Sequence, residues 1–130
     1  MYRIYNTKEQ KWMVRSDIYL SPCPYNDLYI LKRNIFGIKK LKLVPNDEYV
    51  IHKYTGILDK DKFLVFEGDY IKALVSEDRT VIGLVVFAPE LASYIILCND
   101  SDEYFTLGTQ VSEYIEVIGN VFDGYGNREE

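Results

Sequence analysis

The residues most suggestive of chemistry are basic and lie in one short segment. Five cationic side chains surround one aromatic ring there: Lys32, Arg33, Lys39, Lys40 and Lys42 around Phe36. Cationic groups bind the phosphates of a nucleic acid, and an aromatic ring stacks on its bases. The alternatives are a solvated hairpin, or a basic surface that meets acidic residues of the same assembly. We therefore predict that these six residues contact nucleic acid or a protein partner.

Carboxylates spaced by two residues could hold a cation or act as an acid–base pair. Three such pairs occur: Asp59/Asp61, Glu67/Asp69 and Asp100/Asp102. None continues into the glycine-containing loop of a calcium site. The first and third pairs are predicted to be solvated turns. Glu67-Gly68-Asp69 indicates a tight turn, because glycine adopts backbone angles that other residues avoid.

Neither histidine nor cysteine indicates a catalytic or metal site. His52 is the only histidine, no nucleophile motif accompanies it, and it is predicted to be a strand residue on a polar face. Cys23 and Cys98 are too few for a zinc finger and are predicted to be reduced thiols. We predict a protein that is not an enzyme and needs no cofactor, no metal and no known small molecule.

The charge is divided unevenly along the chain. The 130 residues carry 15 Lys+Arg and 20 Asp+Glu, a net charge of −5. Residues 1–53 hold 10 basic and 5 acidic residues, or +5, whereas residues 54–130 hold 5 and 15, or −10. The acidic half argues against a generally basic nucleic-acid binder, and the opposite signs favour self-association. The 12 tyrosines also suit interfaces.

Short aromatic and β-branched runs joined by polar turns predict the elements that position these residues. The expected strands are 2–5, 11–15, 28–33, 38–44, 48–54, 70–75, 80–87, 93–98, 104–107 and 113–122, with 111–118 as an alternative short helix. We expect a mainly β fold, a small SH3-like antiparallel barrel or sandwich with N-terminal β-hairpins and little helix. Its parts are a basic hairpin region at 1–47, which could serve oligomerisation, a barrel-like core at 48–122 and a flexible tail at 123–130.

The strand at 80–87 has apolar residues on both faces, so it is either central in a sheet or part of an interface. The apolar run 81–88 is the longest in the chain and is shorter than the ~20 residues of a membrane-spanning helix. The N-terminus has no secretory signal pattern. We therefore expect a cytoplasmic protein that does not bind a membrane.

Three blocks of sequence resemble the YopX family, proteins encoded by phages and prophages of Gram-positive bacteria. Residues 53–60 (KYTGILDK) and 66–72 (FEGDYIK) are similar to its "YTG-L-DK" and "YEGD" signature, and residues 116–122 (EVIGNVF) to its closing "EVIGNIY". The opening residues 2–6 (YRIYN) resemble its "FRAWD" more loosely, because Tyr5 and Asn6 replace Trp and Asp.

The resemblance implies a phage-associated, β-rich protein in the cytoplasm of a bacterial host, and it carries over no catalytic residue. Four residues of the matching blocks have a predicted structural role. Gly56 and Gly68 permit tight turns, and Glu67 and Asp69 can accept hydrogen bonds from turn amides. The prediction is a homo-oligomer, with nucleic-acid binding through residues 32–42 as the less favoured alternative.

Overall fold

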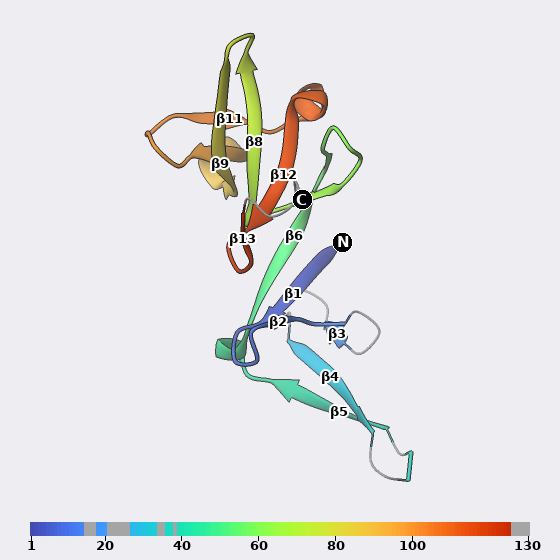
Figure 1. Cartoon of the computed structure of the whole chain (residues 1–130). Helices are drawn as coiled ribbons and strands as arrows, with labels where there is room; N and C mark the ends of the chain where they lie inside the picture. The colour runs from blue at the N-terminus through green and yellow to red at the C-terminus, as the bar shows by residue number, and fades with distance from the viewer. Residues whose placement is uncertain (15–17, 21–26, 34–35, 38, 126–130) are drawn as a thin grey trace. The chain divides into compact units, whose positions relative to one another are not determined.

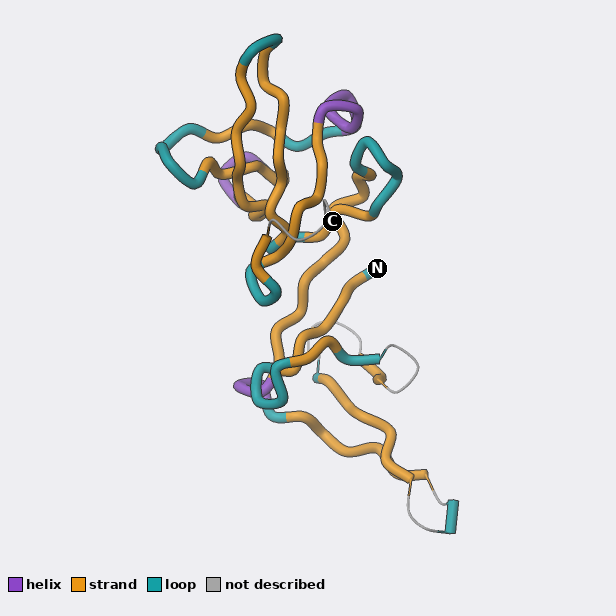
Figure 2. Tube along the Cα trace, in the orientation of Figure 1, coloured by secondary structure: helices purple, strands orange, loops and turns teal. Residues whose placement is uncertain are grey.

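The structure is a computed structural model that describes the chain except for residues 15–17, 21–26, 34–35, 38 and 126–130. Strands make up 61% and helices 11% of the residues described, so the predicted mainly β class is confirmed (Figure 2). Antiparallel sheets are present, and the SH3-like label stays a prediction. The chain forms two compact units, Met1–His52 and Lys53–Glu130.

The first unit contains two antiparallel groups of strands. The group at the N-terminus is the hairpin of β1 (Tyr2–Asn6) and β2 (Lys11–Trp12), in which Tyr5 lies opposite Trp12. The other is a three-stranded sheet in the order β3–β4–β5, formed by β3 (Ile18–Leu20), β4 (Leu28–Arg33) and β5 (Lys39–Val44). Both predicted hairpins are confirmed, and β3 is an additional strand.

A small apolar core holds the first unit together, formed by the buried residues Ile4, Ile18, Leu28 and Val44. A short 3₁₀ helix, η2 (Asn46–Glu48), leads to β6 (Tyr49–Leu58). Residues 49–52 of β6 belong to the first unit and residues 53–58 to the second. In the second unit, β6 pairs with β7 (Leu64–Phe66).

The second unit is built on a six-stranded antiparallel sheet in the order β11–β10–β9–β8–β12–β13 (Figure 1). Its strands are β8 (Asp69–Ser76), β9 (Arg79–Ala88), β10 (Ser93–Cys98), β11 (Tyr104–Thr106), β12 (Ile115–Asn120) and β13 (Gly124–Tyr125). Two 3₁₀ helices, η3 (Pro89–Leu91) and η4 (Thr109–Tyr114), connect them. The largest buried core residues are Ile71, Ile96, Ile115, Val65 and Val85.

The apolar strand at 80–87 is central, since β9 lies between β8 and β10. Val81 and Val85 are buried on one face, and Ile82 and Leu84 are half-buried on the other. Gly83 lies so close to β10 that a Cβ atom there would be 2.7 Å from the carbonyl oxygen of Leu97. The close approach of the two strands explains why glycine is needed here.

The C-terminal segment differs from both sequence predictions for it. Residues 109–114 form η4, and β12 begins at Ile115, so the predicted strand 113–122 begins too early and the alternative helix 111–118 ends too late. Residues 126–130 of the predicted tail lie outside the described residues. Among the described residues, no helix is long and apolar enough to cross a membrane.

Candidate functional site

The β3–β4–β5 sheet presents an apolar face on the side opposite its core. Tyr29 on β4 lies opposite Tyr19 on β3 and opposite Leu43 on β5. Leu31 on β4 lies opposite Leu41 on β5. Residues directly opposite each other in antiparallel strands project to the same face of the sheet. Tyr19, Leu41 and Leu43 are 50%, 50% and 53% exposed. We call Tyr19, Tyr29, Leu31, Leu41 and Leu43 the apolar face.

The other face of the same sheet changes character along its length. At one end Leu28 and Val44 are buried in the core, and towards the other end three exposed lysines follow: Lys32, Lys40 and Lys42. Lys32 lies directly opposite Lys40. Like charges in this position destabilise a sheet, and we find no ion pair for these three lysines among the described residues. An anionic partner would relieve their repulsion.

Phe36 lies at the turn that joins β4 to β5, between residues 34–35 and 38, which are outside the described part of the chain. Its side chain is 80% exposed. Gly37 follows with φ = 77°, a left-handed conformation that favours glycine. Arg33 and Lys39 lie opposite each other at the ends of the two strands, and their side chains are not described. The six residues singled out in the sequence therefore share one hairpin.

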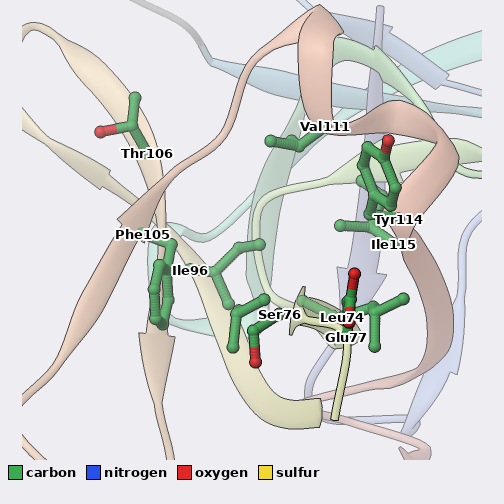
Figure 3. Close-up of a pocket in the computed structure, with 11 residues that line it drawn as sticks. Leu74, Ser76, Glu77, Ile96, Phe105, Thr106, Val111, Tyr114 and Ile115 are labelled. Atoms are coloured by element: carbon green, nitrogen blue, oxygen red, sulfur yellow. The ribbon is translucent and has the colours of Figure 1, made fainter. Parts of the chain in front are cut away.

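The second unit contains an apolar pocket that sequence patterns did not indicate. Its volume is about 430 Å³, and residues of β8, β10, β11, η4 and β12 line it. In Figure 3, Ile96 and Phe105 lie on one side of the pocket, Tyr114 and Ile115 on the other, and Val111 between them. A sequence pattern could not identify this set, because its members come from five elements that only the fold brings together.

One acidic residue, Glu77, lines this pocket from the turn between β8 and β9. Asp78 follows in the same turn, and both side chains are exposed. Glu113 precedes the lining residue Tyr114 on η4 but lines a neighbouring pocket, which also contains Lys60 and Lys72. Arg79, next to Asp78, is paired with Glu103 at 2.8 Å. The pocket therefore has an apolar interior and a carboxylate at the β8–β9 turn.

The turn at residues 66–69 is fixed by hydrogen bonds. Gly68 has φ = 84°, its N–H donates to the Val85 carbonyl at 2.8 Å, and its carbonyl accepts from the Val121 N–H at 3.0 Å. Asp69 is 1% exposed, and its Oδ2 accepts the Phe66 N–H at 2.8 Å. These bonds attach the turn to the second unit's sheet.

Glu67 belongs to this turn, whereas Gly56, predicted to permit a tight turn, lies inside β6 where the pairing with β7 shifts register. Glu67 Oε1 accepts the N–H of Lys53 at 2.8 Å, and Gly56 has φ = 86° within β6. The hydrogen bonds given above join Glu67, Gly68 and Asp69 to the protein's own backbone, and the left-handed backbone of Gly56 and Gly68 favours glycine. Their arrangement is that of structural residues.

Asp59 corrects the prediction of a solvated turn at Asp59/Asp61. The Asp59 side chain is fully buried, with an exposed fraction of 0%. Its Oδ1 accepts the N–H groups of Asp61 and Phe63, both at 2.9 Å, and its Oδ2 accepts the N–H of Val117 on β12 at 3.0 Å. One carboxylate therefore shapes its own turn and binds a strand 58 residues away in sequence.

His52 is also placed differently from the prediction, because it is buried, not on a polar face. Its ring centroid lies 6.0 Å from that of Trp12, and Arg3 Nη2 lies 3.5 Å from its Nδ1. Burial, together with the positive charge of Arg3, lowers the pKa of His52 to about 4. The ring is therefore neutral at pH 7 and packs in the first unit.

The described part of the chain contains no candidate metal site and no exposed cysteine. No cluster of three or more His, Cys, Asp or Glu residues with metal-binding geometry occurs there. Cys98 is a buried free cysteine, and Cys23 lies outside the described residues.

Comparisons with known proteins place these features in context. A family model described as "YopX protein" matches residues 1–124. The crystal structure of protein yopX from Bacillus subtilis is similar with a TM-score of 0.62 and 12% identity, over 93% of this chain and 91% of that chain. Protein EF1440 from Enterococcus faecalis has a TM-score of 0.49 and 17% identity, over 93% and 92% of the two chains. A search of curated proteins finds no match.

Proposed function

The chain belongs to the YopX family, and from this premise we propose that it is a non-enzymatic protein that self-associates through its β4–β5 hairpin. The family resemblance supports a phage or prophage origin and a place in the cytoplasm of a bacterial host. Its biochemical role in this proposal is to form an assembly or to bind partners.

The observation that carries the proposal is the apolar face of the β3–β4–β5 sheet. Half of the surface of Tyr19, Leu41 and Leu43 is open to solvent, on a sheet whose other face forms the core at one end. Exposed apolar side chains that gather on one face mark interaction surfaces. Tyrosine is enriched at such surfaces because its ring is apolar and its hydroxyl can reach a polar partner or water.

The mass of the protein in solution tests the proposal. Sedimentation velocity over a range of concentrations is expected to show species heavier than the 15.2 kDa monomer. The double variant Leu41→Ser/Leu43→Ser removes the centre of the apolar face and is expected to shift the protein towards monomer. Leu91→Ser is the matched control, because Leu91 is a similarly exposed leucine on η3 in the second unit. A wild-type protein that stays monomeric at every concentration and salt would overturn the proposal.

A second function is favoured by the Lys32–Lys40 pair. Two lysines held directly opposite each other, with Lys42 beside them, form a site where an anionic partner such as a nucleic-acid backbone would relieve repulsion. The lysines lie on one face of the hairpin, and Leu41 and Leu43 lie on the other face. Variants on each face can therefore separate the two functions.

Fluorescence anisotropy with labelled single- and double-stranded DNA and RNA at 50 mM salt tests this second function. Binding should weaken steeply with added salt and with Lys40→Glu/Lys42→Glu, and should be kept in Leu41→Ser/Leu43→Ser. If the wild-type protein produces no change in anisotropy with any of these probes, the hairpin does not bind nucleic acid.

A further inference from the structure

We propose that the apolar pocket of the second unit receives Phe36 from the hairpin tip of a second copy of this chain. The inference rests on the proposed self-association and names the site that receives the hairpin. It makes the contact heterologous, with the tip of one molecule in the pocket of the next.

The pocket suits an aromatic side chain in chemistry and has ample room for one. Its volume of about 430 Å³ is in the range of small-molecule pockets, so a phenyl ring fills part of it. Ile96, Phe105 and Val111 supply aliphatic and aromatic walls, and Tyr114 adds a second ring on the other side (Figure 3). An aromatic ring that enters would pack against rings and branched side chains, the surroundings in which aromatic residues contribute most to binding.

The hairpin tip offers a matching group. At 80%, Phe36 has the highest exposed fraction of the large apolar side chains that the structure describes. Transferring it from water into an apolar pocket is favourable, because apolar surface is removed from solvent.

Charge complementarity indicates a second copy as the occupant. Lys32 and Lys40 lie on the strands that flank Phe36, and Glu77 lines the pocket, with Asp78 next to it in the same turn. The charges of the two halves of the chain, +5 for residues 1–53 and −10 for residues 54–130, extend the match beyond the site. Opposite potentials steer association and fix the orientation of the partners.

A heterologous contact of this kind has a consequence for assembly. Each molecule carries one tip and one pocket, so both remain available at the two ends of any dimer. Repetition of the contact gives a ring when the rotation closes and a filament when it does not. An isologous contact through the apolar face alone would stop at the dimer.

Two variants with complementary defects test the inference. Phe36→Ser removes the tip group and leaves the pocket intact. Glu77→Lys/Tyr114→Ala changes one edge charge and one exposed wall of the pocket and leaves the tip intact. Each variant alone is expected to lose self-association by roughly 30-fold in affinity, the scale for the loss of an interface anchor.

Mixing the two variants is the decisive measurement. One intact tip and one intact pocket remain, so the mixture should form a 1:1 complex of about twice the 15.2 kDa monomer mass, which neither variant forms alone. Thermal melts of each variant establish that both are folded. If Glu77→Lys/Tyr114→Ala unfolds at a low temperature, Glu77→Lys/Thr106→Ala takes its place.

The outcomes separate the inference from the proposal on which it rests. A monomeric wild-type protein overturns self-association itself. A wild-type assembly that Phe36→Ser leaves unchanged, or two folded variants that do not form the 1:1 complex, overturns the pocket as the receiving site while self-association stands. Charge reversal adds a check. Lys40→Glu alone should weaken self-association, and adding Glu77→Lys in the same chain should restore it. If the two substitutions weaken self-association additively, the proposed contact is contradicted.

Discussion

Replacing Asp59 by alanine removes a buried carboxylate that accepts hydrogen bonds from two turn amides and from Val117 on β12. Each hydrogen bond to a charged group contributes about 1.5–3 kcal/mol. The N–H groups of Asp61 and Phe63 belong to residues with exposed side chains, so water can replace most of their lost bonds. The N–H of Val117 lies in a strand beside the core and cannot be rehydrated so easily.

We therefore expect Asp59→Ala to lower the free energy of unfolding by about 4 kcal/mol. A unit of the size of residues 53–130 is stable by only about 4–12 kcal/mol, so much of its stability would be lost. The thermal midpoint should fall by about 20 °C. The thermal midpoint of Asp59→Asn should lie between those of the wild type and Asp59→Ala. Asparagine keeps one acceptor oxygen, but its amide nitrogen cannot accept a hydrogen bond.

Thermal denaturation followed by circular dichroism measures this change. Asp61→Ala is the matched control, since it removes an exposed carboxylate from the same turn and is expected to change stability by less than about 0.5 kcal/mol. Equal midpoints for Asp59→Ala and Asp61→Ala would refute the reasoning, because they would show that the buried carboxylate contributes no more than a solvated one.

Three further predictions concern pH and two glycines. The pKa of His52 falls from 6.5 in the unfolded chain to about 4 on folding, so its full contribution to stability is present above pH 6.5 and is lost as the pH falls towards 4 and below, by about 3 kcal/mol in all. Urea denaturation at pH 7 and pH 3.5 should show a smaller pH dependence for His52→Gln, and an equal one contradicts the prediction. Gly68→Val should cost roughly 2 kcal/mol, because a β-branched residue is strained at φ = 84°; an unchanged thermal midpoint would count against it. Gly83→Ala should cost about 1–3 kcal/mol, because its Cβ would meet the Leu97 carbonyl oxygen at 2.7 Å; a melt like that of the wild type would show that β9 and β10 separate without cost.

The sequence determines most of the strands and the location of the basic hairpin. Alternating and β-branched runs mark β4, β5, β8, β9 and β10, since these patterns reflect a local property, the period of two along a strand. The clustering of Lys32, Phe36 and Lys40 is equally local, because a hairpin brings its two arms together whatever else the chain does. Membership of the family follows from motifs that are contiguous in sequence.

Burial and the pocket depend on residues that are far apart in the chain. Asp59 has the sequence context of a solvated turn, and only its bond to Val117, 58 residues away, shows why it is buried. His52 lies on a strand between Ile51 and Lys53, a context that does not show whether it is buried, and it packs against Trp12 from another hairpin. The pocket assembles from β8, β10, β11, η4 and β12, so no single segment carries its pattern.

The β class, the hairpins and the opposite charges of the two halves can thus be read from the amino-acid sequence, because composition and neighbours along the chain set them. The exposed apolar face of the β3–β4–β5 sheet, the burial of Asp59 and the apolar pocket depend instead on the folded chain. One cause explains all three. Solvent exposure is a property of what packs against a residue, and packing partners are chosen by the fold and not by adjacency in sequence.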